Sequence, residues 1–146
     1  MTEETLTAQN LVQTAHVVGL RFSELFAALD LTPTQFAVLI ELEALDDGDD
    51  GLTQAELARR VLVRPQSVRV LLSSLVEQGL VTRDGPGGKG RRVGVSLTAE
   101  GRAALARSWP SVRAFNTPES LGLSRAQAAM LNELLDRVRA AREAGF

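Results

Sequence analysis

Apolar residues recur every three to four positions through the N-terminal part of the chain. Over residues 4–28 this spacing predicts one long helix that is apolar over much of its girth. Such a helix needs more partner surface than a small domain offers, so we expect it to be buried in a dimer. A second helix is predicted to begin with Thr32 as its N-cap, to place Pro33 at its first position and to end near Leu45.

Two short helices joined by a tight turn are predicted in the middle of the chain. Residues 53–56 (TQAE) form a capping box for the first helix, which ends near Arg60 before a turn through residues 61–63. The second helix begins at Pro65 and is closed by Gly79 in the left-handed conformation. Its apolar stripe comprises Val68, Leu71, Leu72, Leu75 and Val76. Its opposite face carries Arg, Gln and Ser side chains, which a helix reading the DNA major groove needs.

The period of the pattern changes after this helix. Residues 80–83 and 93–97 predict two strands, and Leu52 predicts a short strand beside them. The intervening residues 84–92 hold four glycines and three cations. Glycines allow close approach to another backbone, and cations on a hairpin tip suit phosphates or a minor groove. A basic hairpin directly after a helix-turn-helix predicts a winged helix.

Two more helices are predicted after the hairpin. Thr98 caps the first, which Pro110 should kink or end near Ser108. Residues 115–124 (FNTPESLGLS) predict a loop, and a capping box at residues 124–127 begins a last helix that runs to about Glu143. The apolar face of this last helix comprises Ala128, Leu131, Leu134, Leu135 and Val138. The expected fold is therefore mostly α with a small β wing: a winged helix-turn-helix plus terminal helices whose apolar faces need cover.

Charge is strongly segregated along the chain, although the net charge of the 146 residues is only −2. Residues 1–58 carry a net charge of −10, residues 59–107 carry +7 and residues 108–146 carry +1. A run of charge is often just a solvated face. Here the basic segment coincides with the predicted helix-turn-helix and wing, which favours a DNA-binding surface.

Four segments carry a likeness to a known family: LTPTQFAVLIELE, LTQAELARRV, SVRVLLSSLVEQGLVTR and GRRVGVSLTAEGR. They resemble the MarR family of bacterial transcriptional regulators over about residues 31–135. The resemblance implies one domain over residues 1–146. Its parts would be dimerisation helices at 1–30 and 110–146, and a winged helix-turn-helix at 31–109 with its wing at about 80–97. It further implies a homodimer that represses transcription from a pseudo-palindromic operator in double-stranded DNA.

The wing departs from the family pattern at one position. Many members carry Asp-x-Arg there, and counting back from Leu97 places Arg91 on the arginine and Lys89 on the aspartate. The arginine is kept and its usual orienting carboxylate is replaced by a cation. The added cation should not weaken attraction to DNA.

The predicted DNA contacts lie on the wing and on the helix that begins at Pro65, which we call the recognition helix. Arginine suits guanine O6 and N7, glutamine suits adenine N6 and N7, and serine suits phosphates. Val70 is predicted to touch a thymine methyl group; the alternative is an ordinary exposed valine. Thr53 and Gln54 are expected to add backbone contacts. The full set is Arg64, Gln66, Ser67, Arg69, Val70, Ser73, Ser74, Lys89, Arg91 and Arg92.

The resemblance also implies a small aromatic or phenolic effector, because family members often bind one between the dimer module and the winged helix. By position alone, the candidate contacts are His16, Arg21, Trp109 and Arg113. Simpler roles are a packed helical histidine for His16 and a core aromatic for Trp109.

Other functional classes find little support. One histidine, no cysteine and no tyrosine leave few residues for a catalytic pair, so we expect no enzyme activity. A calcium loop starting at Asp46 would need carboxylates where Gly48 and Leu57 stand, and GGKG lacks the rest of a phosphate-loop motif. We therefore expect no metal and no cofactor.

The polar start MTEETLTAQN and the absence of an apolar run of about 18 residues predict a cytoplasmic protein without a signal peptide or a membrane partner. The competing hypothesis is a winged helix that serves as a protein-interaction or assembly module without specific DNA binding. Such a module needs neither a basic wing nor cations on its outer helix.

Overall fold

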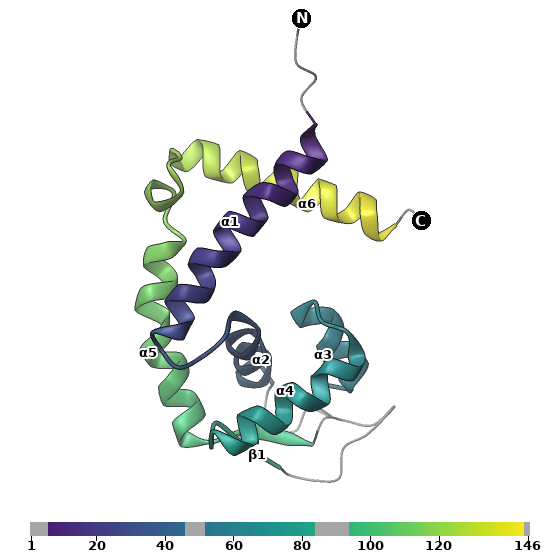
Figure 1. Cartoon of the computed structure of the whole chain (residues 1–146), viewed down its shortest axis with the longest axis vertical. Helices are drawn as coiled ribbons and strands as arrows, with labels where there is room; N and C mark the ends of the chain where they lie inside the picture. The colour runs from purple at the N-terminus through teal and green to yellow at the C-terminus, as the bar shows by residue number, and fades with distance from the viewer. Residues whose placement is uncertain (1–5, 46–51, 84–93, 145–146) are drawn as a thin grey trace, which may run out of the picture. The chain divides into compact units, whose positions relative to one another are not determined.

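The computed structural model describes residues 6–45, 52–83 and 94–144. Along the chain its elements are α1 (Thr7–Ala27), α2 (Pro33–Glu43), α3 (Gln54–Val61), α4 (Pro65–Glu77), β1 (Val81–Arg83), β2 (Val95–Leu97), α5 (Ala99–Phe115), the 3₁₀ helix η1 (Glu119–Leu121) and α6 (Arg125–Glu143) (Figure 1). The expected class, mostly α with a small antiparallel sheet, is confirmed. The chain forms two compact units, divided inside α5 between Ser108 and Trp109.

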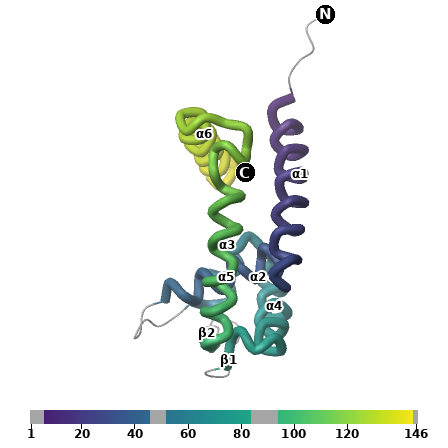
Figure 2. The backbone as a smooth tube through the Cα atoms, turned by 90° about the vertical axis from the view of Figure 1, so that its left-hand side faces the viewer, coloured from purple at the N-terminus to yellow at the C-terminus, as the bar shows by residue number. Residues whose placement is uncertain are grey.

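Only the C-terminal end of α1 packs onto the other helices of the first unit. Phe26 is fully buried, with its ring centroid 4.7 Å from that of Phe36 in α2 and 5.1 Å from that of Phe22. Toward its N-terminus α1 continues as a rod beyond the group of α2, α3 and α4 (Figure 2). The N-terminal part of the apolar face that predicted this helix, with Val12, Ala15 and Val18, is therefore exposed within one chain.

The predicted start of α2 is confirmed. The Thr32 hydroxyl accepts the Gln35 backbone N–H at 3.1 Å, and the Gln35 side-chain oxygen accepts the Thr32 backbone N–H at 3.1 Å. Pro33 occupies the first helical position, where a missing N–H costs nothing. The helix ends at Glu43, two residues before the predicted Leu45.

Of the capping box predicted at the start of α3, the Thr53 cap is confirmed. The Thr53 hydroxyl accepts the Glu56 backbone N–H at 3.1 Å and donates to the Glu56 carboxylate at 3.1 Å. Leu62 then turns the chain in the left-handed conformation, with φ of 58°. At the other end of α4, Gly79 has φ of 75°.

Two backbone bonds close α4 in a Schellman motif: Leu80 N–H donates to Leu75 C=O and Gly79 N–H to Val76 C=O, both at 3.0 Å. The predicted stripe of α4 faces the core: Val68, Leu72 and Leu75 are buried, as are Leu39 of α2, Leu57 of α3 and Leu105 of α5.

The two strands pair antiparallel, with Val81 opposite Leu97 and Arg83 opposite Val95. The prediction of a short strand at Leu52 was wrong as far as the described residues go. Leu52 has no strand pairing there and is buried in the core, while the next residue, Thr53, forms an isolated bridge. The cause is that Thr53 caps α3, so the chain turns into the helix before a strand can extend.

The start of α5 is fixed against the end of α4. The Thr98 backbone N–H donates to Leu80 C=O at 3.1 Å, and the Thr98 hydroxyl donates to Gly79 C=O at 2.6 Å. The same hydroxyl accepts the Gly101 N–H at 3.0 Å, as predicted for an N-cap. One residue therefore joins the recognition helix, the wing and α5.

Pro110 was predicted to kink or end this helix near Ser108; an end there was wrong, because α5 continues through Pro110 to Phe115. Proline removes one backbone hydrogen bond from a helix but leaves those on either side available. The side chain of Ser108 is buried and donates to Ala104 C=O at 2.7 Å. The boundary between the compact units still falls just before the proline.

The second unit holds the rest of α5, η1 and α6. The predicted loop at residues 115–124 begins within α5 and contains η1, so it is more ordered than the sequence indicated. The capping box of α6 is confirmed: the Ser124 hydroxyl accepts the Gln127 N–H at 3.1 Å, and the Gln127 side chain accepts the Ser124 N–H at 2.9 Å. No residue of α6 is buried in the single chain.

Candidate nucleic-acid interface

The N-terminal half of α4 presents exposed side chains of the types that read base edges. Arg64, the N-cap of α4, is exposed together with Gln66, Arg69 and Val70. Arg64 and Arg69 make no ion pair with the part of the chain that the structure describes. Within the described residues, no carboxylate therefore competes for their guanidinium groups. Val70 is 71% exposed, which agrees both with a contact to a thymine methyl group and with an ordinary exposed valine.

The predicted serines are less exposed than the arginines. Ser67, Ser73 and Ser74 are all half-buried. The Ser74 hydroxyl accepts a hydrogen bond from the Gln35 side-chain amide at 3.2 Å, so it belongs to the contact between α4 and α2. A phosphate contact by Ser74 would compete with this internal bond.

Arg83 is a candidate that the sequence pattern did not single out. This exposed arginine on β1 donates from Nη2 to the Ser73 hydroxyl of α4 at 3.3 Å. It therefore extends the cationic surface from the recognition helix toward the wing. Its signal in the sequence was a cation on the predicted strand that leads into the basic hairpin.

The three predicted cations of the wing tip, Lys89, Arg91 and Arg92, lie outside the described residues. Thr53 and Gln54, at the start of α3, are half-buried. Arg60 of α3 is engaged elsewhere, since its guanidinium contacts the Glu41 carboxylate of α2 at 3.0 Å. This ion pair joins α3 to α2 and takes one cation out of the candidate surface.

The four predicted effector contacts fall in two groups. His16 is exposed on α1, and Arg21 pairs with Glu24 at 3.1 Å on the same helix. In the second unit, the guanidinium carbon of Arg113 lies 5.4 Å from the ring centroid of Trp109, a cation–π contact. A site shared by all four residues stays a prediction.

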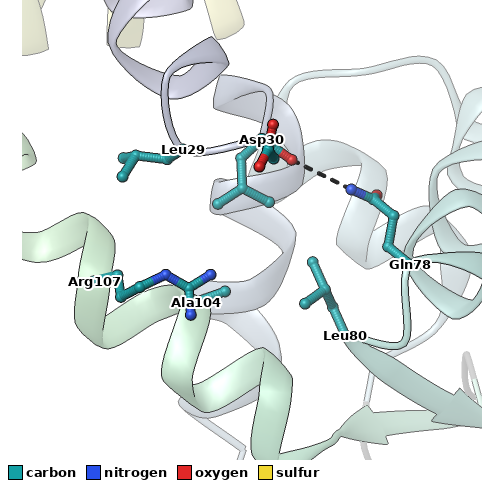
Figure 3. A pocket seen from close by; sticks show the side chains of 7 residues that line it. Leu29, Asp30, Gln78, Leu80, Ala104 and Arg107 are labelled. Atoms are coloured by element: carbon teal, nitrogen blue, oxygen red, sulfur yellow. Dashed lines mark hydrogen bonds between the residues drawn. The ribbon is translucent and has the colours of Figure 1, made fainter.

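A cavity of about 220 Å³ lies elsewhere in the first unit (Figure 3). Its lining comes from the α1–α2 turn, the end of α4 and α5, and it includes none of the four predicted effector contacts. The lining residues are Leu29, Asp30, Leu31, Gln78, Leu80, Ala104 and Arg107. Opposite charges on Asp30 and Arg107 flank apolar walls.

No helix in residues 6–45, 52–83 or 94–144 combines the length and the apolar character needed to cross a membrane. The arrangement described so far is a compact helix-turn-helix with an outward cationic helix and an adjoining antiparallel hairpin.

Known proteins share this arrangement and much of the sequence. A family model described as MarR family matches residues 29–92. The HTH-type transcriptional repressor Rv2887 of Mycobacterium tuberculosis is 32% identical over 116 residues, which cover 80% of this chain and 81% of that protein.

Two solved structures of the same M. tuberculosis protein are similar to this fold. Its complex with DNA has a TM-score of 0.68 at 28% identity, covering 93% of this chain and 98% of that chain. Its complex with salicylic acid has a TM-score of 0.66 at 28% identity, covering 94% and 99%. The likeness thus extends over nearly the whole of both chains.

Proposed function

This chain belongs to the MarR family of winged helix-turn-helix transcriptional regulators, and we propose that it is a sequence-specific DNA-binding repressor that acts as a homodimer. The observation that carries the proposal is the outward face of α4, where Arg64, Gln66, Arg69 and Val70 are all exposed. The similar repressor Rv2887 has been solved in complex with DNA, which supports DNA binding by this chain.

The proposed contacts divide into base readers and phosphate binders. Arg64 and Arg69 pair with guanine edges, Gln66 pairs with adenine, and Val70 contacts a thymine methyl group in the major groove. Ser67, Ser73 and Arg83 bind phosphates and fix the position of the helix. The wing cations Lys89, Arg91 and Arg92 reach the adjacent minor groove.

The homodimer is supported by the apolar surface that one chain leaves uncovered. Exposed large apolar residues occur along α1 and α6, and exposed apolar surface of this kind often marks an interface. The set is Leu6 at the N-cap of α1, Val12, Val17, Val18 and Leu20 on α1, and Met130, Leu131, Leu134 and Val138 on α6. A second copy of the chain supplies the cover, and its two-fold symmetry makes the operator a pseudo-palindrome.

An effector is the last part of the proposal. Rv2887 has been solved with salicylic acid, and we propose that a small aromatic acid likewise binds this protein and releases it from DNA. Such a ligand acts only through a preference for one arrangement of the two DNA-binding heads. His16, Arg21, Trp109 and Arg113 remain the proposed contacts.

The test is selection of bound sequences from a random pool of duplexes, followed by affinity measurements at several salt concentrations. We expect a selected pseudo-palindrome and a log affinity that falls linearly with log salt, since bound phosphates release counterions. The variant Arg69→Glu should lose this binding, whereas Arg125→Glu makes the same change of charge on α6 and should retain it. Weak binding without sequence preference would instead favour a protein-interaction module.

A further inference from the structure

A directional chain of hydrogen bonds connects the recognition helix to the α1–α2 turn. The Thr32 backbone N–H donates to Gln35 Oε1 at 3.1 Å, and Gln35 Nε2 donates to Gln78 Oε1 at 2.8 Å. Gln78 Nε2 in turn donates to the Asp30 backbone carbonyl at 3.3 Å, the dashed line of Figure 3. This row of hydrogen bonds thus starts at the α1–α2 turn, reaches Gln78 at the C-cap of α4 and ends back at the turn.

The orientation of each amide in this chain is set by its neighbours. A glutamine side chain offers one acceptor end and one donor end. Because the Thr32 N–H occupies the oxygen of Gln35, the nitrogen must face α4, where it meets the oxygen of Gln78. The nitrogen of Gln78 is then left for the Asp30 carbonyl. Gln35 itself is buried, so breaking this order leaves polar groups facing the wrong partners.

We infer that Gln35 and Gln78 are positioning residues that set the tilt of α4, and so decide whether its base-reading side chains enter the groove in register. This inference rests on the DNA-binding function proposed above. The buried apolar contacts of α4 hold it against the core, and the pair of amides adds a directional link to α2 and to the α1–α2 turn at the C-terminal end of α4.

The lever length of α4 shows why a small tilt matters. Its 13 residues make a helix about 20 Å long, with Gln78 at one end and Arg64 at the other. A tilt of about 5° at the C-terminal end moves the N-terminal end by about 2 Å. Binding groups need placement to within about 0.5 Å, so the base contacts of Arg64 and Gln66 depend on this distant anchor.

A reversal of hydrogen-bond polarity tests the inference. The variant Gln35→Glu still accepts the Thr32 N–H and keeps the cap of α2, but it offers an acceptor where Gln78 also presents one. The Ser74 hydroxyl can turn to donate to the new carboxylate, but the oxygen of Gln78 still loses the donor that Gln35 supplied. Conversely, Gln78→Arg alone places donors against the donor of Gln35. The double variant restores order, because an arginine can donate both to the new carboxylate and to the Asp30 carbonyl.

The measurement is the ratio of affinities for the selected operator and for random duplex. The ratio removes the general attraction that an added charge near DNA produces. We expect each single variant to lower the ratio about tenfold and the double variant to recover most of it. Urea unfolding of each variant establishes that binding is measured on folded protein.

The possible results test the positioning role and the proposed function separately. If the single variants lose stability but keep the wild-type ratio, or if the double variant does not recover it, the inference is overturned while the proposed function stands. If the wild-type chain selects no operator, the proposed function fails, and this inference falls with it. Loss in both single variants with recovery in the double supports the positioning role.

Discussion

Gly101 occupies a position where the fold leaves no room for a Cβ atom. A Cβ at this position would lie far inside the van der Waals contact distance of the Leu80 carbonyl oxygen. That carbonyl cannot move away freely, since it accepts the Thr98 backbone N–H at 3.1 Å. The glycine therefore lets α5 approach the start of the wing closely.

We predict that Gly101→Ala lowers the free energy of unfolding by about 1–3 kcal/mol, the usual cost of overpacking a filled site. Chemical unfolding measures this loss. The neighbouring exposed residue provides the control, because Glu100→Ala removes only a favourable charge at the helix start and should cost about 0.5 kcal/mol. Equal effects of the two substitutions would contradict the close approach.

Leu62 gives a second prediction at this scale. It is 80% exposed and holds φ at 58°, a conformation that costs an ordinary side chain about 1–2 kcal/mol. Asparagine tolerates this conformation and a β-branched residue does not, so Leu62→Asn should raise the free energy of unfolding by about 1 kcal/mol and Leu62→Val should lower it. Equal urea midpoints for the wild type, Leu62→Asn and Leu62→Val would show that Leu62 is not strained.

At the scale of elements, α4 and β1 should contribute to DNA binding in different ways. Arg69 lies on the exposed face of α4 that we propose reads bases, whereas Arg83 of β1 lies beside Ser73 at the proposed phosphate surface. We predict that Arg69→Ala relaxes the base preference at one operator position by about 1–3 kcal/mol. Arg83→Ala should weaken binding to all duplexes alike and reduce the slope of log affinity against log salt by about 1. Identical effects of the two variants would show that this division is wrong.

The elements that the sequence predicted well are those with local signals. Thr32, Thr53 and Ser124 cap helices through atoms only three residues away, and Gly79 ends α4 through its own backbone angle. The helix end predicted from Pro110 was wrong, because a proline ends a helix or not depending on the helix around it, and the sequence rule for proline does not include that context. The outcome at Leu52 differed for a similar reason, since the cap of α3 begins at the very next residue.

The candidate site was predicted in part. The exposed face of α4 followed from its period, because residues opposite a buried stripe must face outward. The internal role of Ser74 did not follow, since its partner Gln35 lies 39 residues away in sequence. The pairing of Gln35 with Gln78 spans 43 residues and likewise carries no local pattern. Contacts between polar side chains of distant elements depend on the assembled core.

At the scale of the whole molecule, the proposed dimer depends on the exposed apolar residues of α1. Val12 on α1 is 68% exposed in the single chain, although it belongs to the apolar face that predicted the helix. A glutamate at an exposed position costs little, whereas a buried unpaired carboxylate is strongly destabilising. The effect of Val12→Glu therefore reports whether a second chain covers this face.

We predict that Val12→Glu converts the dimer to monomers at micromolar concentration and abolishes high-affinity operator binding, since one head alone lacks half of the contacts. Val70→Glu is the matched control: the same change at an equally exposed valine of α4 should keep the dimer while weakening DNA binding. Sedimentation equilibrium separates the two effects, because only Val12→Glu should change the measured mass. A dimer that survives Val12→Glu would place the interface away from this part of α1, and monomers in the wild-type chain would refute the homodimer altogether.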